Sequence, residues 1–237
     1  MRDARITKLG QGLQRASSVQ KLFIDAAITA QFKRFIPSEF GVNTREARGT
    51  KFGQFVAPKI ANVDYLIELS NEYSWFSWTG IVTGYDAQNM PALSVSDSTL
   101  KCKTCQIYYS GNEPFSSTNL AFIGKYVAAS LAKPEATASK LLTIACFTIT
   151  QNEVKRSIEE EIGSELTVAN VKTSDLEKIG QQKLANNDPS AFIEYLSQYV
   201  FSDSAGQAVT ENTAVTVLGL QEESLRETVR AAIAATQ

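Results

Sequence analysis

Histidine is absent from this sequence of 237 residues, and cysteine is scarce. Without histidine, Ser–His and Cys–His nucleophiles and imidazole-bound metal ions are excluded. Three cysteines are too few for a disulfide framework. Cys102 and Cys105 form a C-x-x-C pair, but a structural zinc site needs two further ligands and only Cys146 remains. We therefore predict no metal site and interpret the pair as incidental.

A strong charge of either sign and long apolar runs are also lacking. Lysine and arginine together number 23 and aspartate and glutamate 25, so the net charge is −2. A chain with this balance has no basic field to attract nucleic acid. No apolar run approaches the length of a membrane span, and residues 1–5 lack the apolar stretch of a secretory signal. We expect a cytoplasmic protein with no nucleic-acid and no membrane partner.

What is present is the composition of a globular protein, with 43% hydrophobic and 20% charged residues. Residues 19–30 carry apolar side chains at the spacing of one helix face: Val19, Leu22, Phe23, Ala26, Ala27 and Ala30. An aromatic run then ends at Pro37 and indicates a short buried strand. Because a helix, a strand and a loop in this order are half of an α/β repeat, we predict a parallel sheet.

The loop after this strand is the stretch around which the chain is organised: Pro37-Ser38-Glu39-Phe40-Gly41. Proline stops the strand ladder, and glycine permits backbone angles that other residues avoid. In an open α/β sheet, ligands bind at the loops that follow the carboxyl ends of the strands. From the local pattern alone, an ordinary junction between strand and loop is the alternative interpretation.

A second candidate is Lys59, which follows Pro58 at the predicted start of a helix. Val63 and Leu66 share its helix face, so the lysine is expected near the inward side of the first turn. The positive end of the helix dipole and partial burial would both lower the pKa of the amine toward neutrality. Such an amine suits proton transfer. The alternative is a lysine whose stem covers apolar surface while its charge stays in water.

Further elements are expected along the rest of the chain. Strands are predicted at three places: 75–84, 107–109 and 141–149. Helices are predicted to begin at five residues: Thr118, Thr150, Ser174, Asp188 and Glu222. Thr150 and Ser174 each open a Ser/Thr-x-x-Glu capping box.

Three segments resemble one known family. Residues 35–41 resemble the R-F-x-P-S-E-F-G signature of the isoflavone reductase-like branch of the NmrA-like family, which belongs to the atypical short-chain dehydrogenases. Residues 20–30 are similar to its Q-x-x-L-I-D-A-A helix and residues 75–84 to its W-T-x-I-x-T-G segment. The resemblance implies an α/β fold: an incomplete doubly wound, Rossmann-like parallel sheet with a smaller α+β substrate lobe. It assigns residues 1–88 to the dinucleotide-binding domain and 89–237 to the lobe, part of which returns to the sheet.

The resemblance also implies a site. The family's catalytic lysine opens a helix of the form K-x-x-V-x-x-x-L, and the matching residue here is Lys59, with its apolar partners spaced one residue differently. The implied NADPH-binding residues are Gly10, Pro37, Ser38, Glu39, Phe40 and Lys59. The implied substrate-binding residues are Thr83, Gly84 and Tyr85. The resemblance thus implies an NADPH-dependent reductase that acts on a small, aromatic or phenolic substrate.

Compared with the family, the sequence lacks the first mononucleotide-binding half. It has no strand followed by G-x-x-G-x-x-G and a helix, the turn that holds the pyrophosphate of a dinucleotide. Three explanations stay open: a truncated reductase, a diverged relative that no longer binds a dinucleotide, or a sheet edge covered by a partner, as in a homodimer. The alternative function is a non-catalytic regulator of the NmrA-like type that senses dinucleotides or binds another protein.

Overall fold

The computed structural model describes residues 4–6, 13–86, 101–209, 217–220 and 223–234. The chain divides into two compact units, each assembled from separate stretches of sequence. Unit 1 comprises Met1–Val82, Gly124–Ile144 and Asn212–Leu220. Unit 2 comprises Thr83–Ile123, Ala145–Glu211 and Gln221–Gln237.

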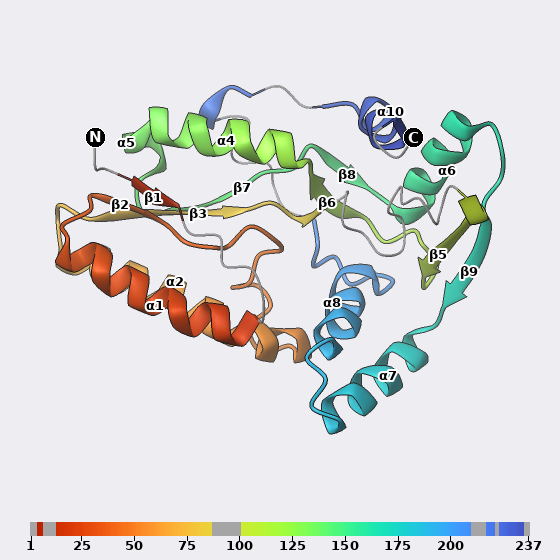
Figure 1. Ribbon diagram of the computed structural model, residues 1–237, viewed down its shortest axis with the longest axis horizontal. Coiled ribbons are helices and arrows are strands. Elements are labelled where there is room, and N and C mark those ends of the chain that lie inside the picture. The colour runs from red at the N-terminus through yellow and green to blue at the C-terminus, as the bar shows by residue number, and fades with distance from the viewer. Residues whose placement is uncertain (1–3, 7–12, 87–100, 210–216, 221–222, 235–237) are drawn as a thin grey trace. The chain divides into compact units, whose positions relative to one another are not determined.

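Unit 1 is built on a parallel sheet with the strand order β1-β2-β3-β7 (Figure 1). The strands are β1 (Ala4–Ile6), β2 (Arg34–Ile36), β3 (Ser77–Val82) and β7 (Lys140–Thr143). The connecting helices are α1 (Leu13–Thr29), α2 (Lys51–Glu72), α4 (Leu120–Ala132) and α5 (Pro134–Thr137). Figure 1 shows α1 and α2 on one side of this sheet and α4 on the other. The predicted parallel α/β sheet is therefore confirmed.

The buried face of α1 differs from the apolar stripe expected from the sequence. Leu22, a member of that stripe, is 66% exposed, whereas Gln20, Ile24 and Ala27 are buried. These three residues follow the i, i+4, i+7 spacing of one helix face. The observed face includes the polar Gln20, so the apolar pattern alone predicts a face that is shifted from it.

The core of unit 1 lies between these two helices and the sheet. Its buried members are Ile24, Ala27, Phe35, Val63, Leu66, Leu69, Phe76 and Trp78. Phe35 in β2 is completely buried at the centre of this set. Burying one such side chain contributes about 1.5–3 kcal/mol, so the short strand β2 is held mainly by its packing.

Helix α2 begins at Lys51 rather than at Pro58, which corrects the predicted start. The hydroxyl oxygen of Thr50 caps the helix by accepting a hydrogen bond from the backbone N–H of Gly53 at 2.9 Å. Pro58 lies inside the helix, although an interior proline removes one backbone hydrogen bond. Proline favours the first helical position, but here the threonine cap and the buried side chains of Phe52 and Val56 extend the helix further upstream.

The amino-terminal end of β2 carries a buried arginine, Arg34. Its guanidinium donates hydrogen bonds to Ser77 Oγ at 2.7 Å, Thr79 Oγ1 at 2.9 Å, Thr137 Oγ1 at 3.0 Å and the Pro134 carbonyl at 2.6 Å. Burial lowers the pKa of this guanidinium. One side chain therefore joins β2 to β3 and to α5.

Unit 2 contains two small sheets. The first has the order β4-β6-β8 and comprises β4 (Tyr85–Asp86), β6 (Phe115–Thr118) and β8 (Phe147–Ile149). The second is a parallel pair of β5 (Thr104–Tyr108) and β9 (Thr167–Val171). The single strand expected over 141–149 is thus two strands, β7 and β8, which belong to different units.

The helices of unit 2 are α6 (Gln151–Ile162), α7 (Thr173–Ala185), α8 (Ala191–Phe201) and α10 (Leu225–Ala234). The capping box predicted at Thr150 is confirmed, with Glu153 as its partner. The box predicted at Ser174 is wrong, because α7 begins at Thr173 after Lys172, which makes no side-chain cap bond. Within the described part of the chain, no helix combines the length and the apolar character that crossing a membrane requires.

Candidate functional site

The loop after β2 is fixed to helix α1 by a buried side chain. The backbone N–H of Ser38 donates to Gln20 Oε1 at 2.7 Å, and the N–H of Glu39 donates to the Pro37 carbonyl at 2.9 Å. Pro37 and Glu39 are buried, whereas Ser38 and Phe40 are partly exposed. The loop is therefore held in place by hydrogen bonds and leaves two of its residues partly exposed.

Glu39 is completely buried. One of its carboxylate oxygens, Oε2, accepts a hydrogen bond from Thr44 Oγ1 at 2.8 Å. The other, Oε1, has no hydrogen-bond partner among the described residues. Burial raises the pKa of this carboxyl group, while the positive charge of Lys59 and the bond from Thr44 act in the opposite direction.

Lys59 lies on α2 and faces this loop. Its Nζ donates a long hydrogen bond of 3.5 Å to the backbone carbonyl of Glu39. Burial lowers the pKa of the Lys59 amine, and the Glu39 carboxylate acts to raise it. The residue as a whole is partly buried.

The predicted effect of the helix dipole on the pKa of Lys59 is wrong. Lys59 lies more than two turns beyond Lys51, where α2 begins. The helix dipole acts only within the first turn, so it does not explain the lowered pKa of this amine. Burial alone accounts for the lowering.

The residues implied as substrate contacts, Thr83, Gly84 and Tyr85, belong to unit 2. Thr83 is buried, and the ring of Tyr85 packs on Phe201 with a centroid separation of 5.3 Å. Gly84 has φ +66°, and a Cβ atom there would lie 2.2 Å from the backbone oxygen of Ser116. Glycine is thus required at this position by its positive φ and by its close approach to the backbone of β6. The role of these three residues in substrate binding stays a prediction.

The NmrA-like family model matches residues 4–211. The chain belongs to the NmrA-like family. The resemblance seen in the sequence is thereby confirmed. Of the residues implied for the cofactor site, Gly10 lies outside the described residues, whereas Pro37, Ser38, Glu39, Phe40 and Lys59 come together at the end of β2.

Known relatives of this NmrA-like protein include oxidoreductases. Oxidoreductase aprR of Aspergillus flavus is 33% identical over 172 residues, which are 70% of this chain and 55% of that protein. The matched stretch therefore spans about half the length of this curated relative.

Solved reductases share the fold. The binary complex of leucoanthocyanidin reductase from Vitis vinifera with NADPH has a TM-score of 0.79 at 20% identity, covering 98% of this chain and 75% of the reductase. AtPrR2, solved with NADP+ and (+)pinoresinol, has a TM-score of 0.75 at 18% identity, and the match covers 97% of this chain and 75% of the AtPrR2 chain. At such identities the similarity shows a Rossmann-like α/β fold.

Two residues that build the site were missed as functional residues in the sequence. Gln20 orients the loop through the N–H of Ser38, and Thr44 holds the Glu39 carboxylate. Gln20 begins the Q-x-x-L-I-D-A-A segment, so a signal for it existed. Thr44 lies in a polar stretch whose pattern does not distinguish it from its neighbours.

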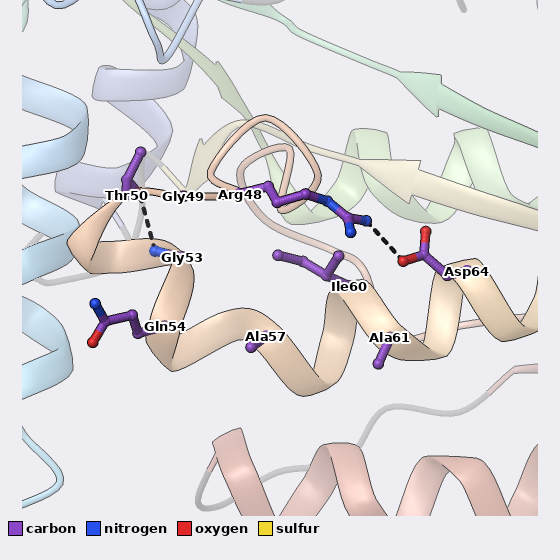
Figure 2. Close-up of a pocket in the computed structure, with 9 residues that line it drawn as sticks. All are labelled: Arg48, Gly49, Thr50, Gly53, Gln54, Ala57, Ile60, Ala61 and Asp64. Carbon is purple, nitrogen blue, oxygen red and sulfur yellow. Dashed lines mark hydrogen bonds and ion pairs between the residues drawn. The ribbon is translucent and has the colours of Figure 1, made fainter.

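A shallow depression of about 320 Å³ lies along the outer side of α2 (Figure 2). Its lining residues are Arg48, Gly49, Thr50, Gly53, Gln54, Ala57, Ile60, Ala61 and Asp64. An ion pair of 2.7 Å between Arg48 and Asp64 crosses it. Neither Glu39 nor Lys59 lines this depression. We interpret it as a surface groove left by small side chains and not as part of the site.

Proposed function

We propose that this chain is an NADPH-dependent oxidoreductase of the isoflavone reductase-like type that acts on a small, aromatic substrate. The observation that carries the proposal is the contact between the Lys59 amine and the Glu39 carbonyl. It joins the lysine to the loop at the carboxyl end of a parallel strand, which is the position where open α/β sheets bind ligands.

The described residues fit the nicotinamide end of the cofactor. Ser38 and Phe40 flank the buried Glu39 in the sequence and are partly exposed, and Lys59 supplies a hydrogen-bond donor at the Glu39 carbonyl. Glu39 adds a buried carboxylate oxygen with no partner among the described residues. NADPH, when bound, would supply the hydride, which is chemistry that side chains cannot provide.

The chain's own contribution would be orientation and proton control. Burial keeps the pKa of the Lys59 amine below its usual range, which brings proton transfer closer to neutral pH. The protonated amine would orient a substrate oxygen and donate a proton to it as the hydride arrives. The hydrogen bond to the Glu39 carbonyl would keep the amine at the loop before substrate binds.

The direct test is titration of the chain with NADPH, followed by fluorescence or calorimetry. We expect saturable binding with a dissociation constant below roughly 1 mM. Absence of saturation in that range would contradict a working reductase site in this chain.

A matched pair of variants then separates binding from chemistry. Lys59→Met is expected to lose about 10²–10⁴-fold in reductase rate on a panel of aromatic and phenolic substrates. NADPH binding is expected to weaken but to stay measurable, because the loop residues would still contact the cofactor. Lys51→Met, on the same helix but with an exposed side chain, is the control and is expected to retain the rate. Saturable binding without turnover of any substrate would favour the dinucleotide-sensing alternative.

A further inference from the structure

Glu39 is an ionisable residue whose side chain is buried in unit 1. Its carboxyl group is completely buried, yet it receives one hydrogen bond, from Thr44, and leaves Oε1 without a partner among the described residues. A buried carboxylate is ordinarily held by several donors or by a cation. Lys59 is a cation that acts on this carboxyl group, and its amine contacts the backbone carbonyl of the same residue.

We propose that Glu39 is a positioning residue for Lys59: its carbonyl holds the amine at the loop, and its buried carboxyl group sets the charge that the amine carries. This inference rests on the proposed function for its catalytic meaning, because only a reductase would use Lys59 as a proton donor. The contact with the carbonyl and the under-satisfied carboxyl group stand without it.

Among the described residues, the charge that shifts the pKa of Lys59 is that of Glu39, and the charge that shifts the pKa of Glu39 is that of Lys59. Burial disfavours the charged form of each, whereas the opposite charge of the partner favours it. The charged state of one group therefore stabilises the charged state of the other.

Thr44 acts on this pair through the Glu39 carboxylate. Its hydroxyl donates to Glu39 Oε2 and so favours the ionised carboxylate, which in turn favours the protonated amine. The chain of influence thus runs from the Thr44 hydroxyl through the Glu39 carboxylate to Lys59. A purely structural role for Glu39, as a buried anchor of the loop, would leave the proton state of Lys59 unchanged when the carboxyl group is replaced.

The experiment follows the Lys59 amine itself. The protein is labelled with lysine that carries ¹⁵N at Nζ, and the Lys59 resonance is assigned by its loss in Lys59→Arg. The resonance is then followed as a function of pH in the wild type and in Glu39→Gln. Glutamine keeps the shape of the side chain and an oxygen that accepts the Thr44 hydroxyl, but it carries no charge.

We expect the Lys59 midpoint to fall by about one pH unit or more in Glu39→Gln, because burial then acts unopposed. Thr44→Val, which removes only the hydrogen bond, is expected to lower the midpoint by a smaller amount and provides a second test should Glu39→Gln fail to fold. Glu46→Gln is the control, since Glu46 is an exposed carboxylate of the same loop. It should leave the midpoint unchanged.

An unchanged Lys59 midpoint in Glu39→Gln, or in Thr44→Val if the first variant does not fold, would overturn the proposal. The titration needs neither cofactor nor substrate, so its outcome is separate from that of the NADPH experiment. Where reductase activity is present, the pH profile of kcat should move to lower pH in Glu39→Gln and stay in place in Glu46→Gln.

Discussion

Replacement of Gly84 by alanine tests how the second unit is assembled. Gly84 has φ +66°, a conformation that costs an L-residue about 1–2 kcal/mol. The new Cβ would also lie 2.2 Å from the Ser116 backbone oxygen, in a strand paired with a neighbour on each side. Because such a strand cannot shift freely, overpacking adds about 1–3 kcal/mol. We expect Gly84→Ala to lower the free energy of unfolding by about 2–5 kcal/mol.

Gly163→Ala is the matched control for this prediction. Gly163 ends α6 with the same φ of +66°, but a Cβ there meets no atom within 4 Å. It should therefore lose only the backbone contribution, about 1–2 kcal/mol. Urea unfolding followed by far-ultraviolet circular dichroism measures both losses.

Equal losses in the two variants would refute the close contact between Gly84 and Ser116. A Gly84→Ala protein that is insoluble while Gly163→Ala is soluble would agree with it. A Gly84→Ala protein of normal stability that no longer acts on substrate would instead favour direct contact between this residue and the substrate.

Three further outcomes are expected. Arg34→Met should lower the free energy of unfolding by about 2–3 kcal/mol, because the Pro134 carbonyl loses its charged donor. Lys33→Met, at the exposed neighbouring position, should change the free energy of unfolding by less than about 0.5 kcal/mol. Equal effects of the two variants would contradict the role of the buried guanidinium. Thr150→Ala should cost about 1 kcal/mol in thermal or urea unfolding through loss of the α6 capping box, and an unchanged stability would argue against the cap. Glu39 gives a pH dependence: since its pKa is raised in the folded protein, its favourable contribution is complete below the unfolded value of about 4.3 and is lost as the pH rises through the folded value. The unfolding free energy of Glu39→Gln relative to wild type should therefore increase from about pH 4 upward, and a difference that stays constant with pH would show that Glu39 titrates normally.

Sequence patterns predicted the elements whose signals are local. Local patterns of a few residues predict the parallel sheet, the strand before Pro37 and the capping box at Thr150. These patterns are the apolar periodicity, the proline that ends a strand and the residue types that cap a helix. The family signature directed attention to the loop and to Lys59, which the structure brings together.

What the patterns could not supply depends on contacts between distant residues. The preference of proline for the first helical position predicts a start of α2 that is too late. The helix extends upstream of Pro58 because it has buried side chains there. The division of 141–149 between two sheets depends on which other strands are available for pairing, and the residues of this stretch carry no pattern that predicts it. The bond from Gln20 to Ser38 joins positions eighteen residues apart and depends on where α1 packs.

The discontinuity of unit 1 has a consequence for the order in which the chain folds during synthesis. Strand β3 pairs in parallel with β7, with Thr79 opposite Lys140 and Val82 opposite Thr143. Of the chain between these two strands, Thr83–Ile123 belongs to unit 2. A ribosome that has released the chain through β3 but not yet β7 has therefore produced a sheet in which β3 has an unpaired edge. That edge is covered only when Lys140–Thr143 emerge. Nascent chains that stall before this point would be the species most exposed to aggregation and to capture by chaperones.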